Sequence, residues 1–222
     1  MQYTLFGNFR SPYSYMVYAG MTYKQLQFIY KNIDLNQKEQ KAPEYLAMNP
    51  MGQIPLLVVE DKQPIFESTA IIEYLEDSNP NLSLFPKDSY AKSIIRTLWC
   101  LLSGSIIKDA RNLFLASLGR ITLTIEQRIE NQNVVQAKCQ VLENLLSKHH
   151  QLLITDNPFM YLFYQAWYNL SLGFPEIRTI CSRLEKYHQE ISHNNTIKML
   201  ENITEVKQLR NKMYSNHNKE SI

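Results

Sequence analysis

Glycine and cysteine are scarce in this sequence, and their scarcity excludes several kinds of site. The chain has 6 glycines and 3 cysteines among 222 residues. With so few glycines, it carries no glycine-rich phosphate-binding loop. Cys100, Cys139 and Cys181 lack the spacing of a zinc site, and this small odd number favours a reducing compartment over a disulfide framework. His149 and His150 are adjacent and would point in different directions on a helix, so we expect no metal site.

The sequence also lacks an excess of charge and long apolar runs. Its 23 basic and 21 acidic residues leave a net charge of +2, and no basic block predicts nucleic acid as a partner. Charged residues interrupt every apolar run, so we expect no membrane segment, and residues 1–4 lead into a strand rather than a signal peptide. With 45% hydrophobic residues, the chain can bury a sizeable core. We expect a cytoplasmic globular protein.

The most informative stretch runs from residue 49 to residue 76. Residues 56–59 form an apolar run of strand length that begins after Pro55, and residues 64–66 are predicted to return beside it as a hairpin. Proline is tolerated at the start of a strand and can be cis there. Glu67 and Ser68 then begin a helix, where free N–H groups and the helix dipole favour a bound carboxylate. This stretch predicts a small anion-binding site.

The residues before this stretch predict an α/β unit. Residues 2–7 and 27–33 are predicted strands, and the helix between them begins with Ser11 as N-cap and Pro12 at the first helical position, ending near residue 24. Residues 36–42 are a predicted loop at the rim of the site. Strand, helix, strand, hairpin and helix together predict a thioredoxin-like domain.

The residues after this stretch predict a separate helical domain. Residues 79–88 are rich in proline and asparagine and form the predicted linker between a domain over 1–78 and a domain over 89–222. We expect Leu84 or Phe85 to pack between the domains. The second domain is predicted to be an all-helical bundle, with helices over residues 89–118, 124–149, 158–172, 175–190 and 196–214.

Three motifs resemble those of a known family. Asn-Pro-Met-Gly-Gln-Ile-Pro at 49–55, Glu-Ser at 67–68 and Ile-Ile-Glu-Tyr-Leu-Glu at 71–76 resemble the glutathione-binding half of the cytosolic glutathione transferases. Within that superfamily the sequence looks most like the zeta class, whose best-known activity is maleylacetoacetate isomerase, or a related bacterial serine-type transferase. Arg-Ser-Pro-Tyr-Ser-Tyr at 10–15 resembles the zeta-class Arg-Ser-Ser-Cys-Ser-Trp. Residues 103–113 also resemble the zeta class.

The resemblance implies a catalytic serine and a bound glutathione. By this match Ser11 is the catalytic residue, whose hydroxyl at a helix N-terminus would hydrogen-bond the glutathione thiolate. Ser14, one turn on, is the second candidate, and Tyr13 is the third. Pro12 and Tyr13 depart from the zeta motif, which has serine and cysteine there. A plain N-cap is the alternative role for Ser11.

The remaining glutathione contacts follow from the same match. Ile54 would pair its backbone N–H and C=O with the cysteinyl part of glutathione, exposed by the bend at Pro55. Glu67 and Ser68 would bind the γ-glutamyl end, although Glu67 could simply complement its helix dipole. Possible contacts to the glycyl end or the backbone are Gln40 and Gln53, and for Gln40 a solvated loop amide is an equal alternative.

Substrate contacts are implied in the second domain. Arg111 stands where the family has a glutamine near the active cleft, and with Arg10 it could bind a substrate carboxylate; a surface ion pair is the equal alternative for Arg111. The capping position before the central helix falls on Leu153 instead of the family's Ser or Thr, and Asn157 could replace that cap.

The resemblance implies a homodimeric enzyme that uses glutathione and no metal. The glutathione thiolate would attack a small electrophile, and transfer, cis–trans isomerisation and peroxide reduction are all open reactions. In the isomerase version the thiolate adds to a cis double bond, permits rotation and leaves again. The alternative is a non-catalytic interaction module that keeps the fold, like stringent starvation proteins, because a fold alone does not establish catalysis.

Overall fold

The structure is a computed structural model that describes residues 2–9, 11–117, 119–149, 171 and 177–191. The described residues form two compact units that divide between Leu84 and Phe85. We call residues 2–84 the first unit and residues 85–191 the second unit. This division falls inside the predicted linker over 79–88, and the limits of the domains themselves stay a prediction.

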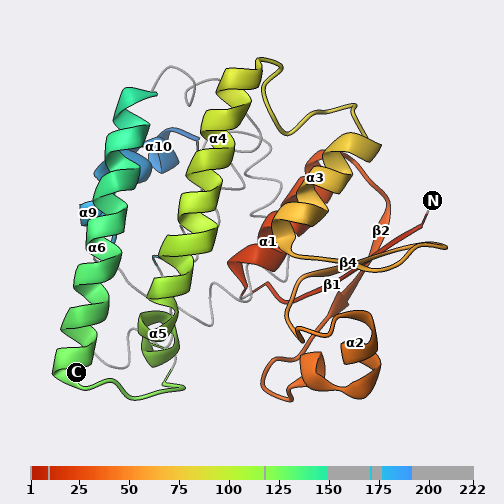
Figure 1. Ribbon diagram of the computed structural model, residues 1–222, viewed down its shortest axis with the longest axis horizontal. Coiled ribbons are helices and arrows are strands. Elements are labelled where there is room, and N and C mark those ends of the chain that lie inside the picture. The colour runs from red at the N-terminus through yellow and green to blue at the C-terminus, as the bar shows by residue number, and fades with distance from the viewer. Residues whose placement is uncertain (1, 10, 118, 150–170, 172–176, 192–222) are drawn as a thin grey trace. The chain divides into compact units, whose positions relative to one another are not determined.

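The first unit is a mixed sheet with helices on both sides. Its elements are β1 (Tyr3–Gly7), α1 (Pro12–Tyr23), β2 (Phe28–Asn32), the 3-10 helix η1 (Glu39–Lys41), α2 (Pro43–Met48), β3 (Leu56–Val59), β4 (Ile65–Phe66) and α3 (Ser68–Ser78). The four strands are ordered β2-β1-β3-β4. The helices α1 and α3 lie side by side on one face of the sheet, and α2 lies on the other (Figure 1). This arrangement confirms the thioredoxin-like prediction.

The alternation of β1 supplies both faces of this sheet. Phe6 meets the ring of Tyr45 edge-on, with 6.2 Å between the ring centroids. It belongs to the small core of the α2 side, which is built on Ile33, Tyr45 and Leu56. Because successive side chains of a strand point to opposite faces, the fully buried Leu5 faces α1 and α3. A single five-residue strand therefore anchors two cores.

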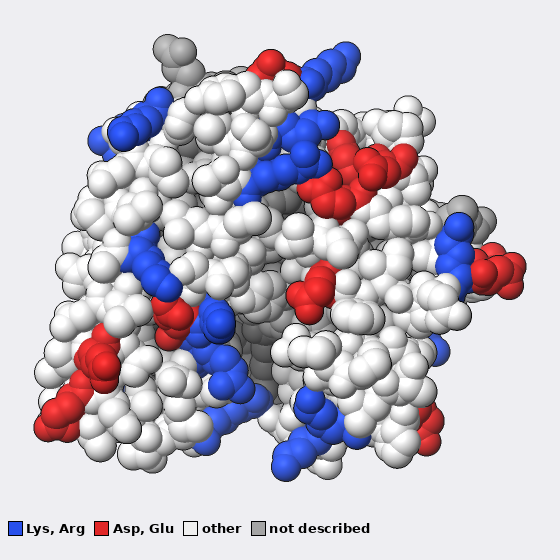
Figure 2. All heavy atoms as spheres, in the orientation of Figure 1, with Lys and Arg blue, Asp and Glu red and all other residues white. Residues whose placement is uncertain are grey.

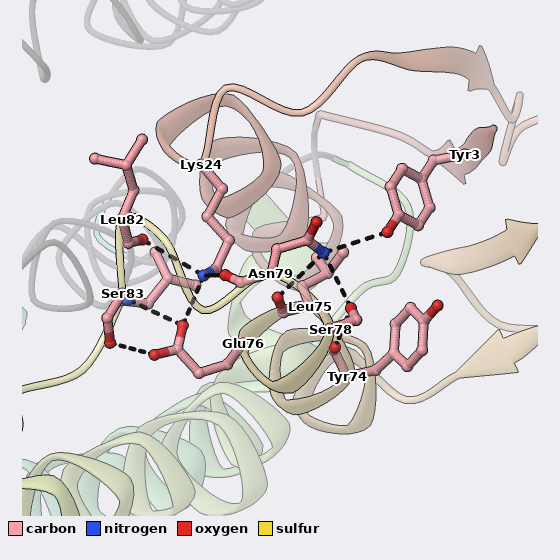
Figure 3. A network of polar contacts seen from close by, with 10 residues as sticks. Tyr3, Lys24, Tyr74, Leu75, Glu76, Ser78, Asn79, Leu82 and Ser83 are labelled. Atoms are coloured by element: carbon pink, nitrogen blue, oxygen red, sulfur yellow. Dashed lines mark hydrogen bonds and ion pairs between the residues drawn. The ribbon is translucent and has the colours of Figure 1, made fainter. Parts of the chain in front are cut away.

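A buried ion pair between Lys24 and Glu76 connects the C-terminal ends of α1 and α3. Lys24 directly follows α1, and its Nζ lies 2.8 Å from Glu76 Oε2 of α3. The same ammonium donates to the Asn79 carbonyl at 2.7 Å and to the Leu82 carbonyl at 3.4 Å (Figure 3). Glu76 also accepts hydrogen bonds from the Ser83 hydroxyl and, at 3.0 Å, from the Leu84 N–H. This network ties α1 and α3 to the chain that leaves the unit.

The secondary-structure elements described in the second unit are all helices. Its elements are α4 (Ser89–Leu101), the π-helical η2 (Leu102–Ile106), α5 (Ile107–Ser117), α6 (Ile125–Lys148), α9 (Ile177–Ile180) and α10 (Ser182–Ile191). The predicted helix over 89–118 corresponds to α4, η2 and α5 in succession. Thr124 begins α6 with a capping box, in which its hydroxyl and the Gln127 side chain exchange hydrogen bonds with backbone N–H groups.

Some expectations lie outside the described residues. These are Arg10, the predicted helix over 158–172 apart from residue 171, the predicted helix over 196–214, and the altered capping positions Leu153 and Asn157. The predicted helix over 175–190 corresponds to α9 and α10, within the described part. Leu84 and Phe85 are both buried. On the face drawn in Figure 2, both basic and acidic side chains lie among uncharged ones.

Candidate functional site

Strand directions bring three separate segments to one edge of the sheet. β1 pairs antiparallel with β3, and β3 pairs antiparallel with β4, so β4 runs parallel to β1. In register, Phe6 lies opposite Leu56, and Leu56 lies opposite Phe66. The chain after β1, the chain before β3 and the chain after β4 therefore meet at the same edge. We call the edge marked by Phe6, Leu56 and Phe66 the site edge.

The predicted glutathione contacts of the first unit come together at this edge. Ser11 follows β1, Ile54 and Pro55 precede β3, and Glu67 and Ser68 follow β4. Both α1 and α3 begin here, and they pack against each other. The positive ends of two helix dipoles therefore point at one place, which favours a bound anion.

Ser11 is the N-cap of α1. Its backbone is extended, and its Oγ accepts a hydrogen bond from the Ser14 N–H at 3.3 Å, with Pro12 at the first helical position. The side chain is partly exposed. Capping uses a lone pair of the oxygen, so the hydroxyl hydrogen can still be donated to a ligand. The N-cap role and the thiolate-binding role of Ser11 are thus compatible.

Ser14 lies in the first turn of α1, on the side that packs against Gly7 of β1. It is fully buried, and its Oγ has no hydrogen-bond partner among the described residues. A Cβ added at Gly7 would lie 3.0 Å from Ser14 Cβ and 3.1 Å from Ser14 Oγ, so the two segments pack more tightly here than most side chains allow. Its burial withdraws Ser14 from contact with a ligand, which leaves Ser11 as the accessible serine of this motif.

Tyr13 lies near Glu67, where the first turn of α1 faces the start of α3. Burial, and secondly the negative charge of Glu67, raise the pKa of Tyr13 from 10.0 to about 12. At neutral pH the phenol therefore stays protonated, so it can donate a hydrogen bond but does not act as a base. The effect of Glu67 on Tyr13 places these two predicted site residues close together.

Glu67 and Ser68 form the start of α3. Glu67 is exposed and has a φ of 70°, which is unusual for a residue with a side chain, and its carboxylate makes no capping hydrogen bond. Ser68 is buried at the first position of the helix. The Glu67 side chain thus does not cap the N-terminus of α3, and a helix N-terminus favours a bound carboxylate.

Buried side chains donate hydrogen bonds to the loop that precedes β3. The carbonyl of Gln53 accepts hydrogen bonds from the Tyr45 hydroxyl at 2.7 Å and from Asn49 Nδ2 at 2.9 Å. Gly52 has a φ of +57°, and a Cβ there would lie 2.6 Å from Lys41 Nζ and 2.9 Å from the Gln40 carbonyl oxygen. The Ile54–Pro55 peptide that follows is cis.

Gln40 also borders this loop. It belongs to η1, and its Oε1 is buried without a hydrogen-bond partner in the described part of the chain. A buried acceptor of this kind can be satisfied by a donor from a ligand. The Gln53 side chain is exposed, and Arg111 is exposed on α5 in the second unit.

Sequence reasoning missed α2 and the two side chains that hold the Gln53 carbonyl. The signal was present in Ala42-Pro43-Glu44, because proline at the first helical position and an acidic first turn are typical of a helix start. Six residues are too few to display a helical period, so periodicity does not distinguish this segment from the neighbouring loop.

The described residues contain no group of three or more His, Cys, Asp or Glu side chains that could hold a metal ion. The three cysteines form no disulfide with one another; Cys100 is exposed, and Cys139 and Cys181 are buried. Among the described helices, none combines the length and the apolar character needed to cross a membrane.

Comparison with known proteins places these features in a family. Residues 1–77 match the family described as "Glutathione S-transferase, N-terminal domain". The chain is 33% identical over 186 residues to the "Probable maleylacetoacetate isomerase" of Caenorhabditis elegans, covering 79% of this chain and 85% of that protein. The chain belongs to the glutathione transferase superfamily. The family membership confirms the resemblance found in the motifs.

Two further comparisons agree with this membership. The chain is 35% identical over 149 residues to the maleylacetoacetate isomerase of Dictyostelium discoideum, covering 65% of this chain and 67% of that protein. Its fold matches the glutathione transferase Ure2p6 of Phanerochaete chrysosporium, crystallised with oxidised glutathione, with a TM-score of 0.76 and 22% identity over 96% of this chain and 97% of that one. This glutathione transferase chain thus has the fold predicted from its sequence.

Proposed function

We propose that this chain is a glutathione-dependent enzyme in which Ser11 holds the thiol of glutathione as a thiolate for attack on a small electrophile. The observation that carries the proposal is the convergence of Ser11, Ile54 and Glu67 at the site edge. Membership of the glutathione transferase superfamily supports it.

Each part of the site has a role in this proposal. The Ser11 hydroxyl and the N-terminus of α1 stabilise the thiolate, which lowers the thiol pKa because both interact better with the anion. The N-terminus of α3, which the Glu67 side chain does not cap, binds the γ-glutamyl carboxylate, and the Glu67 carboxylate binds the ammonium beside it. Gln40, whose buried Oε1 has no hydrogen-bond partner among the described residues, and the exposed Gln53 are the candidates for contact with the glycyl end or the backbone of glutathione.

The names of the relatives favour isomerisation as the reaction. Two of them are named maleylacetoacetate isomerase. In that reaction the thiolate adds to the carbon–carbon double bond, the electron pair moves to the conjugated carbonyl oxygen, and rotation precedes expulsion of the thiolate. Glutathione is regenerated and no net proton is consumed. Arg111, with Arg10, would bind substrate carboxylates in this version.

We also propose that the protein is a cytoplasmic homodimer. Three cysteines that form no disulfide with one another fit a reducing compartment. The dimer is an expectation from the family, and sedimentation of the purified protein tests it.

The test of the site is calorimetric titration with glutathione. Glu67→Ala/Ser68→Ala should abolish binding. The matched control is Asp77→Ala/Ser78→Ala, which removes an acid and a serine from the other end of the same helix and should bind like the wild type. Absence of binding by the well-folded wild type would refute the proposal and favour a non-catalytic module.

The test of the reaction follows if glutathione binds. The enzyme is assayed with maleylacetoacetate, an aryl halide and an organic hydroperoxide. Isomerisation that requires glutathione without consuming it supports the isomerase. Glutathione consumption with the aryl halide indicates transfer, and oxidised glutathione from the hydroperoxide indicates peroxide reduction.

A further inference from the structure

The Gln53 carbonyl is held by two buried donors. The Tyr45 hydroxyl lies 2.7 Å from it and Asn49 Nδ2 lies 2.9 Å from it. Tyr45 is 4% exposed and Asn49 is 1% exposed. Gln53 itself is an exposed residue of a loop, where solvent could satisfy its carbonyl. Because two buried side chains donate to this one carbonyl, the orientation of the Gln53–Ile54 peptide is fixed by the protein rather than by solvent.

Both donors are themselves fixed. Tyr45 packs with Ile33 and Leu56 in the core under the sheet. Asn49 ends α2, where its N–H donates to the Tyr45 carbonyl at 2.8 Å. Its Oδ1 accepts from the Met51 N–H at 3.1 Å, and its carbonyl accepts from the Gly52 N–H at 2.9 Å. Tyr45 is therefore anchored in the core beside the sheet, and Asn49 is tied both to the end of α2 and to the loop that carries Gln53.

The orientation of this carbonyl determines the orientation of the next N–H. The Gln53 C=O and the Ile54 N–H belong to one planar trans peptide, so they point in opposite directions. With the carbonyl directed at Tyr45 and Asn49, the Ile54 N–H is directed away from them. No described residue accepts a hydrogen bond from it. This N–H is thus an oriented donor at the site edge.

We propose that Tyr45 and Asn49 are positioning residues that present the Ile54 N–H to the cysteinyl carbonyl of glutathione. The inference rests on the proposed function, since it assumes that glutathione binds at the site edge. Neither residue touches the reacting sulfur, so their effect falls on binding. Burial raises the pKa of Tyr45 to about 12, against a smaller opposing effect of its hydrogen bond with Asn49, so the hydroxyl remains a donor at physiological pH.

The test uses variants that remove each donor with little other change. Tyr45→Phe removes one hydroxyl. Asn49→Asp keeps an acceptor for the Met51 N–H but loses the donor to Gln53. The matched control is Tyr3→Phe, which removes the hydroxyl of another buried tyrosine of the first unit, where it accepts a hydrogen bond from Asn79 at 3.2 Å.

Binding and turnover are measured together. The Kd for glutathione should rise about threefold to tenfold in each donor variant, as expected for loss of one oriented hydrogen bond, while Tyr3→Phe leaves it unchanged. The kcat at saturating glutathione should stay within about twofold of the wild type, because Ser11 is untouched. If Tyr45 and Asn49 only stabilise the fold, all three variants should lose stability, and the Kd for glutathione of the two donor variants should equal that of Tyr3→Phe.

Hydrogen exchange at the Ile54 amide gives an independent readout. Glutathione should slow the exchange of the Ile54 amide strongly in the wild type and in Tyr3→Phe. In Tyr45→Phe the slowing by glutathione should be much smaller. If Tyr45→Phe shows wild-type protection and a wild-type Kd, the positioning inference is wrong while the proposed function stands. If wild-type protein shows neither binding nor protection, the proposed function fails and the inference with it. If Asn49→Asp does not fold, Tyr45→Phe and the exchange experiment still decide.

Discussion

Lys24→Met should destabilise the protein more than any single change at an exposed charge. The Lys24 side chain is 0% exposed, and its partner Glu76 is 9% exposed. The substitution removes the counter-charge of Glu76 and the donor to the Asn79 and Leu82 carbonyls. Removing one partner of a buried ion pair costs about 3–5 kcal/mol. Because Glu76 keeps its bonds from Ser83 and Leu84, we expect the lower end, about 3 kcal/mol.

A double-mutant cycle isolates the cause of this loss. Glu76→Gln alone leaves Lys24 buried without a counter-charge and should also destabilise. In Lys24→Met/Glu76→Gln no charge is buried, and the amide oxygen of the introduced glutamine can still accept from the Leu84 N–H. The double variant should therefore recover about 2 kcal/mol of the Lys24→Met loss. Urea denaturation at neutral pH measures all four free energies of unfolding.

The more exposed ion pair between Lys138 and Asp109 provides the control. These side chains are 36% and 26% exposed, so Lys138→Met should cost about 0.2–1 kcal/mol. If Lys24→Met costs no more than Lys138→Met, or if adding Glu76→Gln restores nothing, the buried charge is not the source of the stability and the reasoning fails.

The pH dependence of the same pair has a definite sign. Burial alone would raise the pKa of Glu76, but the Leu84 N–H, Lys24 and Ser83 together lower it below 4.5. A carboxyl with a lowered pKa contributes stability that is present above its unfolded pKa and is lost as the pH falls through its folded pKa. The advantage of the wild type over Glu76→Gln should therefore shrink as the pH falls below 4.5.

Three further predictions can be tested on the same protein. Ser11→Ala should lower turnover by about 10²-fold or more, with little change in Kd for glutathione and a raised thiol pKa measured by thiolate absorbance; unchanged turnover would remove Ser11 from the mechanism. Gly52→Ala should destabilise the first unit, because the φ of Gly52 is +57° and an added Cβ would lie 2.9 Å from the Gln40 carbonyl oxygen. As a control, a Cβ added at Gly104 meets nothing within 4 Å, so Gly104→Ala should raise the free energy of unfolding by up to about 1 kcal/mol; urea denaturation measures both variants. Burial raises the pKa of Glu143 despite bonds from the Arg183 and Leu184 N–H groups, so Glu143→Gln should gain stability relative to the wild type as the pH rises above 4.5; a constant difference across pH would contradict this.

The sequence alone determined the order and type of most elements. The apolar run over 56–59, the hairpin return and the helix after Glu67 each carry a local signal in residue type and period, and the structure places β3, β4 and α3 there. Ser11-Pro12 marked the start of α1 because capping is a local interaction between neighbouring residues. The same locality explains why the capped helix α6 was expected over 124–149.

Only the tertiary structure decided how these elements form a site. The meeting of Ser11, Ile54 and Glu67 depends on strand direction and register, and one residue of slippage would turn the side chains to the other face. The sequence left Ser14 open as the second candidate after Ser11, and the close packing of α1 on Gly7 buries Ser14 while Ser11 stays partly exposed. Tyr45 and Asn49 hold the Gln53 carbonyl across four to eight residues of chain, and that contact has no period to reveal it. Interactions between residues close in the chain specify the helices and strands, whereas tertiary packing decides which side chains are accessible to a ligand.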